Sequence, residues 1–250
     1  MRKTSAPPEF CLEDILFDQG FGTRRICTGL VQQGHVRVAD ECVTDPLAMY
    51  PVDGLVLSVH GLDWVCQRVA YAMFHKPAGY EVSQKPKHHA SVYSLLPYPL
   101  RQRPSKGTQG VQAVGRLDED TTGLLLLSDD GQFIHRMSSP KHHVPKVYEV
   151  TLVHDMAAPA VQRLLAGVVL DDDPKPVAAA AAELVTPTHL RLTLTEGKYH
   201  QVKRMVAAVG NRVQTLHRSQ IGELGLGDLP EGQWRWLTPE EIADLTRKRH

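Results

Sequence analysis

The sequence lacks any long apolar run. No stretch reaches the roughly 18 consecutive apolar residues that a membrane-spanning helix needs. The first ten residues are polar, contain proline and have no apolar core of a signal peptide. A net charge is also missing, because 28 Lys and Arg balance 28 Asp and Glu. We therefore expect a cytoplasmic protein that does not enter a membrane.

Cysteine is scarce and scattered. The chain has four cysteines, far apart and without a CxxC pair: Cys11, Cys27, Cys42 and Cys66. A zinc site needs closely spaced ligands, and disulfides persist mainly in oxidising compartments. The neighbouring His142 and His143 have no third ligand at a useful spacing. We therefore expect free thiols and no metal.

The length of 250 residues and the 42% hydrophobic content allow one large or two modest domains with a proper core. Residues 1–60 show two short helical patterns, with Thr23 as an N-cap, followed by short strands. Residues 61–69 are interpreted as a linker, and residues 70–250 as a second domain. Strands and helices mix without regular βαβ alternation, which favours an α+β fold.

The charges are unevenly distributed along the chain. Residues 1–60 carry five basic and eight acidic side chains, residues 61–112 carry seven and two, and residues 198–220 carry five and none. The two basic stretches could form one positive face that binds nucleic acid, or each could be a solvated surface. Residues 83–110 form a long polar loop that carries Arg101, Arg103 and Lys106. We favour the interpretation that this loop contacts RNA.

One loop is far more polar than its flanks. It carries Arg116 and the acids Asp118, Glu119 and Asp120 between two short apolar runs that are typical of strands. A buried loop of this kind would leave charges unpaired, so it should open onto a cleft. An aspartate in a loop is more often a turn or cap residue. Two later stretches favour a chemical role for Asp118.

The first of these stretches, KVYEV at 146–150, alternates like a strand and carries Tyr148. The second, EGKYHQVKRM at 196–205, opens an amphipathic helix predicted over 199–209. Its apolar face goes to the core, and the opposite stripe offers three donors, His200, Lys203 and Arg204. A carboxylate, a tyrosine and a cation are sufficient for chemistry on a ring without a metal.

Together the three stretches resemble the pseudouridine synthases, in the branch typified by the bacterial 16S ribosomal RNA pseudouridine synthase. GRLDEDTTGLLLL is similar to that family's nucleophile loop, KVYEV to its tyrosine strand, and EGKYHQVKRM with the later AVGN and LHR to its third motif. The N-terminal stretch resembles the small RNA-binding module named after ribosomal protein S4. The resemblance extends over roughly residues 12 to 240.

The resemblance implies an S4-like α/β domain followed by a catalytic domain with a mixed, mostly antiparallel sheet and a central cleft. It implies isomerisation of a uridine to pseudouridine in structured RNA, with 16S ribosomal RNA favoured. The enzyme would flip the base out of the RNA, which favours a loop or bulge as substrate. No atom enters or leaves overall, so we expect no cofactor, and we expect a monomer.

The resemblance also implies roles for individual residues. Asp118 is the nucleophile, acting on the ribose or on the ring, and Lys203 keeps it ionised, with Lys198 behind it. Tyr148 packs against the uracil and can take the C5 proton. The other expected substrate-binding residues are Arg116, which helps to hold the flipped nucleotide, His200, Arg204 at a phosphate, and Arg24, Arg25 and Arg37 in the S4-like module. For those last three arginines, a solvated surface is an equal alternative.

Two other functions are alternatives. A non-catalytic RNA-binding or ribosome-assembly factor could use the same scaffold, although the combination of Asp118, Tyr148 and Lys203 argues against it. A metal-dependent hydrolase could use the acidic clusters of the chain.

Chelation distinguishes the hydrolase from the isomerase. We expect pseudouridine formation to continue in excess EDTA, because the predicted chemistry uses a carboxylate, a tyrosine and a lysine. The measurement is product formation with and without EDTA, in monovalent salt that keeps the RNA folded. Loss of activity on chelation, reversed by adding back a divalent cation, would support the hydrolase instead.

Overall fold

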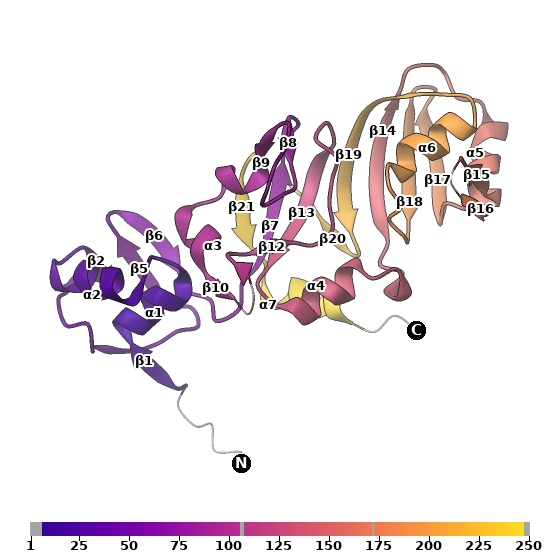
Figure 1. Ribbon diagram of the computed structural model, residues 1–250. Coiled ribbons are helices and arrows are strands. Elements are labelled where there is room, and N and C mark those ends of the chain that lie inside the picture. The colour runs from indigo at the N-terminus through magenta and orange to yellow at the C-terminus, as the bar shows by residue number, and fades with distance from the viewer. Residues whose placement is uncertain (1–6, 106–107, 172, 248–250) are drawn as a thin grey trace, which may run out of the picture. The chain divides into compact units, whose positions relative to one another are not determined.

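The computed structural model describes residues 7–105, 108–171 and 173–247, which form two compact units (Figure 1). The first unit contains the chain up to Ala70 together with Leu96–Gln112. The second contains Tyr71–Leu95 and the chain from Ala113 onwards. In the described part of the chain, no helix is both long and apolar enough to cross a membrane.

The first unit contains two helices, α1 and α2, that pack against each other, and an antiparallel sheet in the order β3-β2-β5-β6. Its elements are β1 (Glu9–Cys11), α1 (Leu12–Gln19), α2 (Arg24–Gln32), β2 (Val36–Val38), β3 (Glu41–Val43), β4 (Met49–Pro51), β5 (Val56–Val59), β6 (Leu62–Val65), α3 (Tyr98–Gln102), β10 (Pro104–Ser105) and β11 (Thr108–Gln109). As predicted, the hydroxyl of Thr23 caps α2, accepting from the backbone N–H of Ile26.

The structure differs from the predicted linker at 61–69. Strand β6 pairs with β5 along its whole length, from Val56 opposite Val65 to Val59 opposite Leu62. The two residues between these strands, His60 and Gly61, have φ values of 50° and 79°. Positive φ at both central residues is the signature of a tight hairpin turn whose twist matches that of the strands. The sheet of the first unit therefore extends beyond residue 60.

A buried polar cluster ties residues 96–112 to the first unit. Gln19 is fully buried, and its side-chain oxygen accepts from Arg103 Nη1 at 3.0 Å, Trp64 Nε1 at 3.1 Å and the Gln67 backbone N–H at 3.0 Å. The Nη2 of Arg103 donates to the carbonyls of Gln67 and Arg68. Arg103 is only 2% exposed. The prediction that it contacts RNA was therefore wrong, because the side chain turns inward; Lys106 lies outside the described residues.

The second unit is built on a mixed, mostly antiparallel sheet in the order β17-β18-β14-β19-β13-β7-β21 (Figure 1). Its strands are β7 (Tyr71–Lys76), β8 (Tyr80–Glu81), β9 (Ala90–Ser91), β13 (Thr122–Ser128), β14 (Lys146–Leu152), β15 (Val168–Leu170), β16 (Asp173–Val177), β17 (Ala181–Thr186), β18 (His189–Leu194), β19 (Val213–Ile221), β20 (Leu224–Gly225) and β21 (Trp234–Trp236), with β12 (Gln112–Ala113) at the boundary. Its helices are the 3-10 turns η1 (Val92–Leu95) and η2 (Pro140–His142), and α4 (Gly131–Ser138), α5 (Ala158–Ala166), α6 (Gln201–Ala208) and α7 (Pro239–Thr246). Within this sheet, β13 and β19 are parallel, and β8 and β9 form a separate parallel pair. The predicted α+β fold is confirmed.

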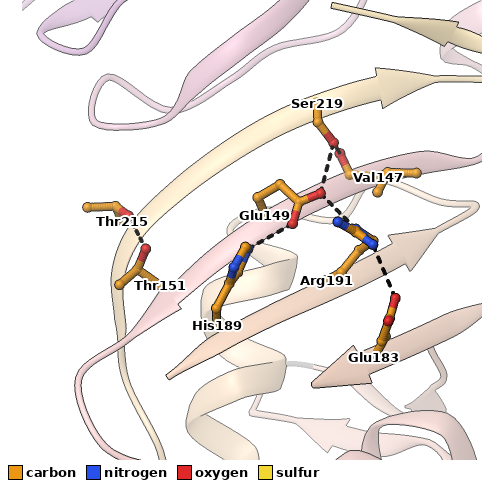
Figure 2. A network of polar contacts seen from close by, with 8 residues as sticks. All are labelled: Val147, Glu149, Thr151, Glu183, His189, Arg191, Thr215 and Ser219. Atoms are coloured by element: carbon orange, nitrogen blue, oxygen red, sulfur yellow. Dashed lines mark hydrogen bonds and ion pairs between the residues drawn. The ribbon is translucent and has the colours of Figure 1, made fainter. Parts of the chain in front are cut away.

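Strand β14 separates two environments. Tyr148, Val150 and Leu152 point into an apolar core with residues of α5 and α6. On the opposite face, Glu149 accepts from His189 Nε2 at 2.8 Å and from Arg191 Nε at 2.9 Å (Figure 2). Burial acts to raise the pKa of Glu149, but the hydrogen bonds from Arg191 and His189 outweigh it and lower the pKa. Because a shift of one residue would exchange the two faces, this network helps to fix the side on which Tyr148 lies.

The Arg103 cluster yields a stability prediction. Replacing Arg103 with Met should destabilise the first unit by about 2–4 kcal/mol, because loss of the buried charged donor leaves several buried acceptors without a hydrogen bond. Hydrogen exchange of the α1 amides in urea measures the change. The matched control is Arg101→Met, an exposed neighbour, which should change stability by less than about 0.5 kcal/mol. Equal effects of the two variants would contradict the structural role of Arg103.

Candidate active site

A pocket of about 340 Å³ opens in the second unit where the three sequence stretches meet. Loop 114–121, strand β14 and the start of α6 line it, together with residues of α4, β18 and β19. The pocket contains six of the predicted site residues: Arg116, Asp118, Tyr148, Lys198, His200 and Lys203. These six residues, which are up to 87 positions apart in the sequence, therefore meet around one cavity.

The centre of the pocket is a group of opposite charges. Lys203 Nζ lies 3.3 Å from Asp118 Oδ2, and His200 Nε2 lies 3.4 Å from Asp118 Oδ1. Lys203 also donates to both oxygens of Asp120, at 2.7 and 2.9 Å. Sequence reasoning did not identify Asp120 as a partner of Lys203, because the loop carries three acids that the pattern cannot distinguish. The aspartate nearest to Lys203 is therefore Asp120, with Asp118 beside it.

Both partners of this ion pair are held in their charged forms. Burial acts to lower the pKa of Lys203, but the hydrogen bond to Asp120 and the charge of Asp118 outweigh it and raise the pKa. Burial acts to raise the pKa of Asp120, and the hydrogen bond from Lys203 lowers it overall. An opposite charge within a few ångströms favours the ionised form of each group. The pocket thus keeps a fixed cation beside Asp118.

Helix α6 presents Lys203 because of its amphipathic pattern. Val202, Met205 and Val206 are buried in the core, which orients the next residue along the helix towards the pocket. His200, the residue just before α6, has a left-handed backbone with a φ of 48°. Its ring stacks on that of Tyr199, with the two ring centroids 3.8 Å apart. Tyr199 is 67% exposed. An aromatic pair therefore stands at the rim of the pocket.

Four predicted substrate-binding residues lie elsewhere. Arg204 is outside the pocket lining, and its Nη1 donates to the carbonyl of Tyr199 at 3.2 Å. In the first unit, Arg24 pairs with Asp14, Arg37 donates to the carbonyl of Asp40, and Arg25 is exposed. Arg24 and Arg37 thus contact groups of their own unit.

Lys76 supports the loop that carries Asp118. It is fully buried, and its Nζ donates to the carbonyls of Pro77 at 2.9 Å, Glu119 at 3.1 Å and Thr121 at 2.8 Å. Burial lowers the pKa of Lys76 to about 8, against the opposing charges of Asp120, Glu119 and Asp118. The side chain of Lys76 therefore points inward and supports the acidic loop.

Gly123 fixes the other end of this loop. Its φ is +110°, and an added Cβ would lie 2.3 Å from the carbonyl oxygen of Arg218. Glycine alone adopts this conformation readily and permits such an approach. The close contact joins β13 to β19 directly after the acidic loop.

Among the described residues, no three His, Cys, Asp or Glu side chains converge in a way that could hold a metal ion.

Two protein-family models match parts of this chain. The model of the RNA pseudouridylate synthase family matches residues 70–208, and that of the S4 domain matches residues 12–46. The chain belongs to the RNA pseudouridylate synthase family. All six predicted residues that line the pocket fall within the matched range.

The similarity extends to individual members of the family. Ribosomal small subunit pseudouridine synthase A of Escherichia coli K12 is 46% identical over 176 residues, which cover 70% of this chain and 73% of the relative. The Haemophilus influenzae protein of the same name is 37% identical over 227 residues, covering 90% and 94%. A crystal structure of a pseudouridylate synthase matches with a TM-score of 0.65 at 34% identity, covering 95% of this chain and all of that one.

Lys76 can be tested as the support of the synthase loop. Lys76→Met keeps the length of the side chain and removes its three hydrogen bonds to carbonyls. We expect at least about a tenfold loss of pseudouridine formation, because small displacements of a reacting group cost large factors in rate. Single-turnover assays with RNA binding measured in parallel check this. The exposed Lys85→Met is the control, and full activity of Lys76→Met would exclude a support role.

Proposed function

We propose that this synthase isomerises one uridine of the small-subunit ribosomal RNA to pseudouridine. The observation that carries the proposal is the ionised Lys203 beside Asp118 in a pocket that also contains Tyr148. The names of two similar relatives support the choice of RNA, since both are called ribosomal small subunit pseudouridine synthase A. The reaction breaks the bond from C1′ to N1, turns the uracil and forms a bond from C1′ to C5.

We infer the role of each pocket residue from its place. Asp118 is the nucleophile, because it is the carboxylate that both Lys203 and His200 approach. Tyr148, 9% exposed, packs against the uracil and accepts the C5 proton. Arg116 is exposed on the loop just before Asp118, where it can hold the flipped nucleotide. Lys198 and His200 supply further donors at the same opening.

We further propose that the S4-like domain contributes RNA contacts outside the pocket. The exposed guanidinium of Arg25 is its strongest donor, whereas Arg24 and Arg37 must exchange contacts with Asp14 and Asp40 to meet a phosphate. Because the reaction is an isomerisation, the enzyme works without a cofactor. We propose that it acts as a monomer in the cytoplasm.

A non-catalytic RNA-binding or assembly factor is not favoured. Such a protein would have no need to keep a carboxylate, a lysine and a tyrosine together in one pocket. The chain retains all three, within the range that matches the synthase family.

The decisive variant is Asp118→Asn, which removes charge but little volume. We expect product to fall by at least about 1,000-fold, as when a nucleophile is removed, while RNA affinity stays within about threefold. Carbodiimide labelling with primer extension maps pseudouridine in total RNA from cells with and without the gene. One signal should disappear when the gene is deleted, and it should return with the wild-type gene but not with Asp118→Asn.

The exposed Asp228→Asn serves as the control and should restore the signal. Turnover by Asp118→Asn would refute the assignment of the nucleophile. If deletion of the gene removes no signal from small-subunit RNA, the proposed substrate is wrong.

A further inference from the structure

Two cations that line the pocket, Arg218 and Lys146, have no carboxylate partner among the described residues. Arg218 is 2% exposed, and its Nε donates to the carbonyl of Leu124 at 2.8 Å. Its Nη2 is also buried, and no described atom accepts a hydrogen bond from it. Buried polar groups nearly always have a partner, so an orphaned guanidinium nitrogen needs an explanation.

Lys146 lines the same pocket and lies close enough to Arg218 for the two positive charges to repel each other. Its Nζ donates to the carbonyl of Val144 at 3.1 Å. Burial, together with the charge of Arg218, lowers the pKa of Lys146 to about 8. Within the described ranges, neither cation forms an ion pair with a carboxylate. Lys203, by contrast, is paired with two carboxylates, so Lys146 and Arg218 differ from it in keeping a positive charge without a carboxylate partner among the described residues.

We propose that Lys146 and Arg218 form a cationic floor that binds the carbonyl oxygens of the target uracil and stabilises the negative charge that this ring gains during the reaction. The proposal rests on the proposed function and assigns to it two residues that recognise the base. Tyr148 lies directly opposite Arg218 on the paired strands β14 and β19, so the floor adjoins the ring that packs against uracil.

The chemistry of the ring fits two cations that line the pocket, one of them buried and the other partly buried. When the bond from C1′ to N1 breaks, its electron pair stays on N1 and spreads over O2 and O4. In the ribose route, a carboxylate oxygen of Asp118 bonds to C1′ as N1 leaves, and C5 then displaces it. C5 next loses its proton and N1 gains one, so atoms and charge balance. Donors placed where negative charge develops contribute more in a site with little water.

The same floor would distinguish uracil from cytosine. Uracil presents O4 as an acceptor, whereas cytosine presents an amino donor at that position. Two cationic donors cannot accept from an amino group, and sites built to hydrogen-bond one group reject the analogue that lacks it. A phosphate is a poorer occupant, because Arg218 is deeply buried while the exposed Arg116 is available to phosphates at the opening.

The test is binding of three RNAs that differ only at the mapped target, which carries uridine, cytidine or an abasic ribose. All binding measurements use the full chain with Asp118→Asn, so that no turnover occurs. Adding Lys146→Met should weaken binding of the uridine RNA by about tenfold, equivalent to one good contact. It should leave the other two RNAs within about twofold, the range of a neutral change. Lys146→Arg should restore the preference for uridine.

Arg204→Met, outside the pocket lining, is the matched control and should weaken all three RNAs alike. Arg218→Lys tests the second cation with its charge retained, and thermal melting checks that each variant folds. Equal weakening of all three RNAs by Lys146→Met would assign the floor to a phosphate and overturn the proposal, as would no weakening. If the wild-type chain forms no pseudouridine in this RNA, the proposed function itself fails.

Discussion

The contact of Lys203 with Asp118 and Asp120 is the constraint on which the pocket depends. An ammonium ion and two carboxylates cannot be partly buried unless they are paired. The lysine comes from α6 and the acids from the loop before β13, so this pairing holds together two segments 83 residues apart. The parallel pairing of β13 with β19, and the place of β14 between β18 and β19, bring these segments to one cavity.

Basic residues in this chain serve the interior as well as the RNA. The buried charged residues of the described part are Lys76, Arg103 and Arg218, and all three come from the two stretches of highest positive charge. Arg103 donates hydrogen bonds within the first unit, and Lys76 donates to carbonyls of the acidic loop. Arg218 lines the pocket. A count of charges along the sequence therefore overstates the positive surface that is available to phosphates.

The sheet of the second unit shows how one strand can serve two purposes. Alternation along β14 places Tyr148 in the pocket. The next residue, Glu149, lies in the polar network on the opposite face (Figure 2). The network of Glu149, His189 and Arg191 is fully paired, which opposes any change of register. The chemistry on one face is thus supported by polar contacts on the other, and the apolar core lies with α5 and α6 on the side of the pocket.

Sequence by itself determined the features that depend on neighbours along the chain. The capping box of α7 joins Thr238 to Glu241, and it depends only on two residues within one turn of the chain. The amphipathic helix predicted over 199–209 is α6, Gln201–Ala208, since its apolar residues recur every three to four positions. Resemblance of three motifs to a known family named Asp118, Tyr148 and Lys203 as a set, and the fold brings them to one pocket.

Tertiary structure alone decided where the long basic side chains point. Lys76, Arg103 and Arg218 find acceptors on segments distant in the sequence, and a local pattern carries no information about such partners. The same holds for the choice between Asp118 and Asp120 as the nearer partner of Lys203. The physical reason is that a buried charge is stable only where several distant groups converge on it, and that convergence exists only in the folded chain.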